Sequence, residues 1–216
     1  MKRFLIVIIA LIFASCMSNH ISKTYSGSAF KNQIIPGKIE CEFYDKGGEG
    51  VAYHDSDNIN NGSGKLNPAN GNFYNEFRMN ESVDISYTKS NNIDNNPYSK
   101  VPPLMNQLYV GWTQPGEWIK YSVDVKETGS YKVDLMYTAN GDGGITFDID
   151  DKPATSILKI ASTHNDADTV AWRQWHHWNK TDSLTTIKLD KGKHILTLHI
   201  AEHGNMNFDY FEFSKQ

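Results

Sequence analysis

The chain has 216 residues, which is enough for one domain and a short targeting segment. Aromatic residues make up 12% of the sequence, and the formal net charge is -4. A chain this weakly acidic lacks the basic surface that nucleic acids need, so no nucleic-acid partner is expected.

A secretory signal opens the sequence. Lys2 and Arg3 precede an apolar run, and small residues then lead into Cys16. This order predicts a signal peptide over residues 1–15. As a helix, the apolar run would rise only about 15 Å, half of a ~30 Å hydrocarbon core, so it is too short to be a permanent membrane span.

Residues 13–16 resemble a bacterial lipoprotein processing site, with Phe13 in the place of the usual Leu. The resemblance implies lipidation at Cys16, and ordinary signal cleavage beside a chance cysteine is the alternative. The expected location is the bacterial cell envelope, at the outer membrane or cell surface, or otherwise outside the cell. The membrane would be contacted only through the N-terminal lipid.

Residues 18–36 are polar and aperiodic, which predicts a lipid anchor and tether over 16–37 and a domain over 38–216. The domain opens with Ile39, Cys41 and Phe43 on one face of an expected strand, and Glu40, Glu42 and Tyr44 on the other. Cys41 is therefore expected to be a small core residue. Cys16 is the only other cysteine of the sequence, so no disulfide framework is predicted.

Further runs of alternating apolar residues follow, with turn-forming residues between them. They cover residues 118–125, 131–137, 145–149, 196–200 and 208–213. Short strands with regular turns predict an all-β fold, a β-sandwich (jelly roll) of two antiparallel sheets. Residues 58–103 are rich in Asn, Gly, Ser and Pro, with a strand-like piece at 82–87, and are expected to lie over one end or edge of the sandwich.

Four segments, in order, resemble the family 6 carbohydrate-binding modules and their family 35 relatives. They are Ile39-Glu40-Cys41-Glu42-Phe43-Tyr44, Val110-Gly111-Trp112 with Gly116-Glu117-Trp118-Ile119-Lys120-Tyr121, Gly129-Ser130-Tyr131-Lys132-Val133, and Gly192-Lys193-His194 with Asn205-Met206-Asn207-Phe208-Asp209-Tyr210-Phe211. The resemblance covers about residues 38–213, and the 58–103 insertion and the segment 172–178 depart from the family pattern.

The resemblance implies a ligand cleft among loops at one end of the sandwich. Its aromatic and amide positions correspond to Trp112 and Asn207, and to either Trp172 or Trp175, of which Trp175 fits the spacing better. Sugar rings have an apolar face and a hydroxyl rim, which such residue types match. The expected partner is an oligo- or polysaccharide that is bound without catalysis.

At least one of Trp172, Trp175 and Trp178 is expected to be structural. Trp118 starts a regular strand and is expected in the core. Adjacent His176 and His177 would point to opposite faces of a strand, so no metal site is expected there.

Glu40, Glu42 and Asp209 form a second constellation. If the first and last strands pair, the three carboxylates come together, and carboxylates suit Ca²⁺. The resemblance implies a structural calcium ion at this place, and a solvated acidic face is the alternative.

The main functional alternative is a small polysaccharide hydrolase or lyase on a jelly-roll scaffold. Glycosidases need two positioned carboxylates, and lyases often use Tyr and His. The sequence contains Tyr53-His54 and many acidic residues but places no pair of them. A purely adhesive protein is a third possibility, and it would not need aromatic residues on loops. Asp55-x-Asp57 lacks the glycine of an EF-hand loop and is expected to form turns.

Overall fold

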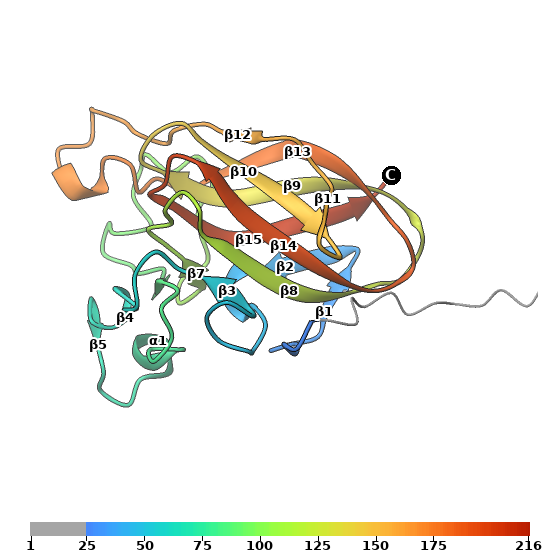
Figure 1. Ribbon diagram of the computed structural model, residues 1–216. Coiled ribbons are helices and arrows are strands. Elements are labelled where there is room, and N and C mark those ends of the chain that lie inside the picture. The colour runs from blue at the N-terminus through green and yellow to red at the C-terminus, as the bar shows by residue number, and fades with distance from the viewer. Residues whose placement is uncertain (1–24) are drawn as a thin grey trace, which may run out of the picture.

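The computed structural model describes residues 25–216, and the segment that contains the predicted signal peptide and Cys16 lies outside this range. Within it, no helix is long and apolar enough to cross a membrane. Two β-sheets pack face to face, and loops gather at one end of the sandwich (Figure 1). The expected all-β sandwich is confirmed.

The first sheet is built around three long strands, and a short N-terminal strand pairs with one of them in parallel. In spatial order its strands are β1 (Gln33–Ile35), β8 (Trp118–Val125), β14 (Gly192–Glu202), β10 (Gly143–Ile149) and β11 (Lys152–Pro153), with β3 (Tyr53–His54) on β8 and β12 (Leu158–Ile160) on β10.

The second sheet has antiparallel pairing throughout. Its strands are β13 (Asn179–Leu189), β9 (Gly129–Ala139), β15 (Met206–Lys215), β7 (Leu108–Val110) and β6 (Ile85–Tyr87), with β2 (Gly37–Glu40) on β15. The turn-forming residues between the predicted strands, at 127–129, 140–144 and 190–193, all lie at the junctions of long strands.

The core between the sheets follows the period-two pattern of the sequence. In β8 the alternate residues from Ile119 to Val125 are buried, and β9 buries Tyr131, Val133, Leu135 and Tyr137 completely. Burying this apolar surface provides the main driving force for folding. A second, smaller cluster lies on the other face of the second sheet and consists of Tyr109, Met136, Trp178 and Tyr210.

The opening segment differs from the prediction. β2 ends at Glu40, and residues Cys41–Phe43 form a 3₁₀ turn. Because this turn rotates the chain, Glu40 and Glu42 do not share one strand face, and Tyr44 is fully buried rather than on the acidic face. Cys41 is fully buried, as expected.

The domain also begins earlier than residue 38. Gln33–Ile35 pair with Val123–Val125 of β8, and Ile35 is fully buried. Ser28 is bridged to Lys46 by two backbone hydrogen bonds. Part of the expected tether therefore belongs to the sandwich, because its short apolar run completes the edge of the first sheet.

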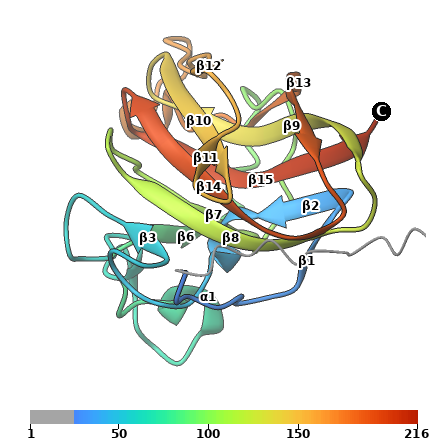
Figure 2. The same ribbon diagram turned by 45° about the vertical axis from the view of Figure 1, so that its right-hand side comes forward.

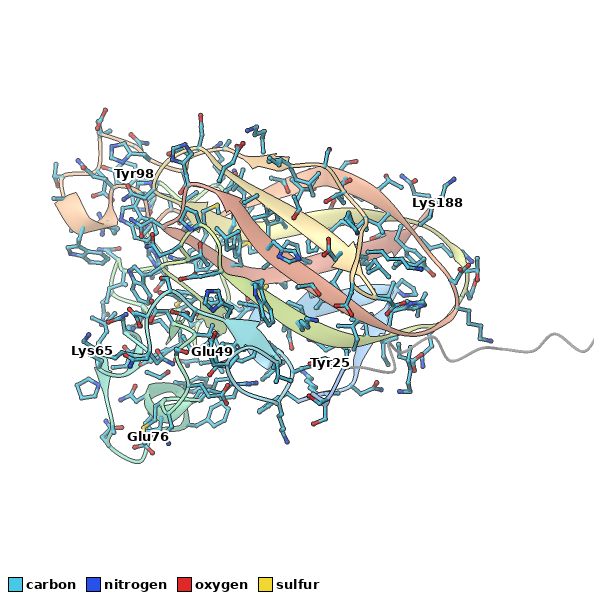
Figure 3. The ribbon with its side chains drawn as sticks, viewed as in Figure 1. Tyr25, Glu49, Lys65, Glu76, Tyr98 and Lys188 are labelled. Carbon is cyan, nitrogen blue, oxygen red and sulfur yellow. The ribbon has the colours of Figure 1, made fainter. Side chains whose placement is uncertain are left out.

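The 58–103 insertion folds onto the loop end of the sandwich. It contributes β6, a short parallel pair of strands β4 (Ser63–Gly64) and β5 (Asn67–Pro68), and one turn of helix α1 (Phe73–Glu76). Figure 2 shows its helix α1 below the sheets. In Figure 3 the labelled Lys65 and Tyr98 mark the insertion end, and Lys188 marks the opposite end.

Candidate functional site

A cleft of about 700 Å³ opens at the loop end of the sandwich. Four separate parts of the chain form its walls: the insertion, β7 with the segment after it, the 171–178 segment before β13, and the loop between β14 and β15. Its lining residues are Leu66, Asn67, Ser86, Lys89, Ile93, Asp94, Tyr109, Trp112, Trp172, Trp175, His176 and Asn205. The structure thus brings together three of the aromatic residues expected in a ligand site.

Trp112 is held in an unusual backbone conformation. Its φ is 48°, a left-handed value that costs a bulky residue about 1–3 kcal/mol and persists only where the surroundings impose it. Its backbone N–H donates to Asn207 Oδ1 at 3.0 Å. A Cβ at the preceding Gly111 would meet the same oxygen at 2.9 Å, so glycine allows this close approach. Trp112 lies on a loop, as expected, and its half-buried ring faces the cleft.

The three Trp residues of the 172–178 segment have different environments. Trp172 lies on the 3₁₀ turn Ala171–Arg173 and is 58% exposed, and the half-buried Trp175 packs its edge against the ring of His176. Both line the cleft, so the structure supplies two aromatic walls where the sequence suggested a choice of one. Trp178 is fully buried, which confirms that at least one member of the segment is structural.

A buried ion pair fixes the position of this segment. The carboxylate of Asp168 accepts a hydrogen bond from Nε of Arg173 at 2.6 Å and lies 2.9 Å from Nε2 of His177. These hydrogen bonds hold the pKa of Asp168 well below its usual range. His176 and His177 precede β13 rather than lying in a strand, and each contacts its own carboxylate, Asp94 for His176 and Asp168 for His177.

Asn207 does not line the cleft in this structure. Its side chain is fully buried on β15, with Oδ1 accepting from Trp112 and Nδ2 donating to Thr138 Oγ1 at 2.9 Å. Its Nδ2 also lies 3.1 Å from Nδ1 of His176. All of its polar atoms have partners beneath the cleft floor, so the expected direct contact with a sugar stays a prediction.

Trp118 is not in the core, contrary to the prediction. It is half-buried on the outer face of the first sheet, where it pairs with His54 and His199 across the neighbouring strands. The reason is the strand period itself: because Ile119 points inward, Trp118 must point outward with Lys120.

Residues that the sequence did not single out complete the cleft. Tyr109 lies 6.5 Å from the ring of Trp112, and Lys89 contributes an amine whose pKa is lowered by partial burial. Tyr109 lies on β7, between β15 and β6, and nothing in its local sequence showed that this strand borders a cleft.

A second pocket of about 360 Å³ adjoins the cleft across Trp112, which lines both. Its carboxylates are Asp55, Asp57, Asp84 and Glu117. Partial burial and the neighbouring negative charges raise the pKa of Asp55 to about 7 and that of Asp84 to about 6. Asp55 and Asp57 also make the expected turns, since each side chain accepts from the backbone N–H two residues ahead.

The proposed calcium ligands are only partly assembled. β2 and β15 pair as required, with Glu40 opposite Tyr210. Glu42 and Asp209 are buried, and Glu42 Oε2 and Asp209 Oδ2 have no hydrogen-bond partner. Burial and mutual repulsion raise the pKa of Glu42, and burial with the charge of Glu40 raises that of Asp209 to about 8. Two buried carboxylates with orphaned oxygens fit a cation.

Glu40 itself points elsewhere, because its carboxylate pairs with Lys31 at 2.8 Å. Within residues 25–216, no group of three or more His, Cys, Asp or Glu side chains is arranged to hold a metal ion. Of the three expected ligands, Glu42 and Asp209 each have a buried oxygen without a partner, and Glu40 is paired with Lys31.

Comparison with solved structures finds similarity to part of a larger enzyme and to isolated modules. A glycoside hydrolase family 43 arabinoxylan arabinofuranohydrolase from Bacillus subtilis, solved with cellotetraose, matches with a TM-score of 0.50 and 13% identity over 86% of this chain. The match spans only 28% of that enzyme.

Two isolated modules are also similar. The module CsCBM6-3 from Clostridium stercorarium, solved with cellobiose, has a TM-score of 0.48 and 14% identity over 86% of this chain and 98% of its own. A module of Cellvibrio mixtus lichenase 5A, solved with cellotriose, has a TM-score of 0.44 and 20% identity over 62% of this chain and 87% of its own.

No curated protein matches the sequence. The family described as carbohydrate binding module (family 6) matches residues 84–215, which include most strands of both sheets and the cleft residues from Ser86 to Asn205. The matched segment is more than half of the chain, and the fold agrees with it. The chain therefore belongs to the family 6 carbohydrate-binding modules.

Proposed function

We propose that the cleft at the loop end binds an oligo- or polysaccharide without turning it over. The observation that carries this proposal is the presence of Trp112, Trp172 and Trp175 in one cleft with a polar rim. Aromatic rings remove the C–H face of a sugar from water, which is worth about 25 cal/mol per Å². At the cleft, the amide groups of Asn67 and Asn205 can donate to and accept from sugar hydroxyl groups, and the amine of Lys89 can donate to them.

The expected affinity is modest, roughly micromolar to millimolar, because ordering a flexible saccharide offsets much of this gain. Titration calorimetry against a panel of polysaccharides tests the proposal. Cellobiose, cellotriose and cellotetraose are suitable first probes, since the similar structures were solved with them. Saturable binding at one site supports the proposal, and no binding across a broad glycan array would contradict it.

The second candidate is a small polysaccharide hydrolase. The observation that favours it is the acidic pocket beside Trp112, where the raised pKa of Asp55 would suit a general acid. Incubating the same polysaccharides with the protein and measuring reducing ends and unsaturated products separates the two functions. Product release that disappears in Asp55→Asn would establish the hydrolase, and binding without product would establish the module.

We also propose that a structural calcium ion binds at Glu42 and Asp209, with Glu40 as the third carboxylate. An ion bound only to the native state stabilises the fold by mass action and supplies the missing partner of the two orphaned oxygens. Chelation is expected to lower the melting temperature, and added Ca²⁺ is expected to restore it.

The control for this prediction is Asp209→Asn, which removes a charged ligand. Its melting curve is expected to respond less to chelator than that of the unsubstituted protein. A melting curve that ignores chelator, in a sample whose elemental analysis also finds no calcium, would contradict the proposal.

The last part of the proposal concerns location. We propose that the chain is anchored to a bacterial envelope membrane through a lipid on Cys16, on the basis of the sequence order that ends at this residue. A diacyl or triacyl anchor holds a protein at a membrane surface. Cys16→Ala is therefore expected to release the protein from the membrane fraction or to leave it mislocalised. Unchanged fractionation of Cys16→Ala would refute the anchor, and Cys41→Ala, which alters only the buried cysteine, is the matched control.

A further inference from the structure

A chain of hydrogen bonds beneath the cleft connects its walls. It runs from the backbone N–H of Trp112 to Asn207 Oδ1 (3.0 Å), from Asn207 Nδ2 to His176 Nδ1 (3.1 Å), and from His176 Nε2 to Asp94 Oδ1 (2.7 Å). Asp94 is almost fully buried and also receives the indole N–H of Trp178 at 2.8 Å and the backbone N–H of Lys89 at 2.6 Å. The chain therefore joins β15, the 171–178 segment and the loop after β6.

The donors in this chain fix the protonation of His176. A backbone N–H only donates, so the Asn207 atom that faces Trp112 must be the oxygen, and its amide nitrogen must face His176. The Nδ1 atom of His176 therefore accepts and carries no proton. The proton of the neutral ring lies on Nε2, where Asp94 accepts it.

We propose that His176 is a positioning residue of the saccharide cleft: its neutral ring holds Asn207 in the orientation that keeps Trp112 in place, and its protonation releases Trp112 and weakens binding. A proton on Nδ1 would face the Asn207 NH₂ group, donor against donor. Rotating the amide would relieve this contact but would turn its NH₂ toward the backbone N–H of Trp112. The bond that maintains the 48° φ of Trp112 would then be lost.

The surroundings of His176 contain few other groups that titrate. Asp94 faces Nε2, and the ring of Tyr109 from β7 lies 5.9 Å away, with a pKa raised by burial far above neutral pH. Lys89 lines the same cleft and bonds to Asp94 through its backbone rather than its amine. Trp175 and Trp178 complete the contacts of the ring. Asp55 and Asp84 in the neighbouring pocket also border Trp112, and their raised pKa values of about 7 and about 6 lie in the range between about pH 7.5 and pH 5, where histidine ordinarily titrates. The part of the pH response that passes through His176 is therefore isolated by the variant His176→Asn.

The first experiment needs no ligand and no substitution. Ring nitrogen shifts of the ¹⁵N-labelled full chain are expected to show His176 with an unprotonated Nδ1 at neutral pH. On acidification, the amide signal of Trp112 is expected to shift with the same midpoint as the His176 ring. A protonated Nδ1 at neutral pH, or a Trp112 amide that ignores the ring, would overturn the proposal.

The second experiment rests on the proposed function and measures affinity for cellotriose, or for the strongest ligand of the panel, from about pH 7.5 to pH 5. Binding is expected to weaken about tenfold, the equivalent of one well-formed hydrogen bond. His176→Asn places a non-titrating oxygen near the position of Nδ1 and is expected to flatten this profile.

His177→Asn is the matched control, because His177 is equally buried and bonds to its own carboxylate, Asp168, without contacting Asn207. Its pH profile is expected to follow that of the unsubstituted protein. Equal flattening in both variants, or no pH dependence at all, would overturn the proposal. If no glycan binds while the Trp112 amide still follows His176, the proposed function fails and the positioning role stands.

Discussion

Trp112→Ala is expected to abolish saccharide binding and to leave the domain folded. The ring is half-buried, lines the cleft and has no place in the main apolar core, so its loss removes a sugar platform without opening a core cavity. Affinity should fall at least about tenfold, since one sugar face loses its aromatic contact. Calorimetry measures the affinity, and circular dichroism checks the fold.

Trp118→Ala is the matched control for this prediction. The same side chain is removed at a half-buried position, but on the outer face of the first sheet and outside the lining of the cleft. Affinity is expected to stay within about twofold of the unsubstituted protein. If Trp118→Ala abolished binding while Trp112→Ala did not, the ligand would lie on the sheet face and the loop cleft would be the wrong site.

Trp178→Ala is expected to destabilise the domain by about 3–5 kcal/mol, as large truncations in a core do. Trp178 is fully buried between Tyr109, Met136 and Tyr210, and its indole N–H satisfies Asp94. The substitution leaves a cavity and removes one hydrogen-bond partner of a buried carboxylate. Chemical denaturation gives the free energy of unfolding.

The comparison with Trp118→Ala again provides the control. Trp118 contacts His54 and Lys120 at the surface, and its loss should cost well under the value for Trp178. Equal destabilisation by the two substitutions would contradict the assignment of Trp178 as the structural member of its segment. Loss of binding in Trp178→Ala is also expected, because Asp94 and His176 lie on the cleft wall.

Strand periodicity predicted the sandwich well because it is a local property. The alternation at 118–125 became β8 with identical bounds, and the last apolar run became β15 beside β2. The same alternation shows why the expectation that Trp118 is buried was wrong. That expectation followed from the large apolar side chain, whereas the place of Trp118 in the pleat, next to the inward-facing Ile119, directs it outward. The turn at Cys41–Phe43 could not be predicted, because its three residues fit a strand equally well.

The cleft was predictable only in part. The resemblance pointed to Trp112 and to the 172–178 segment, and the structure places them together. The acidic pocket unites Asp55, Asp84 and Glu117 from three distant parts of the chain, and no local pattern encodes such a meeting. The burial of Asn207 depends on His176 and Thr138, which come from other strands and loops.

β1 pairs with the end of β8 that lies away from the cleft, so the N-terminal strand and the cleft are at opposite ends of the domain. β1 contacts Val123–Val125, whereas the cleft lies beyond the other end of β8, near Trp112. Eight strand residues separate these ends by roughly 25 Å. In Figure 1, β1 and the C-terminus lie on the right and the loops on the left. Immobilising the domain on a bead or sensor chip through a group placed before β1 would therefore leave the cleft pointing into solution.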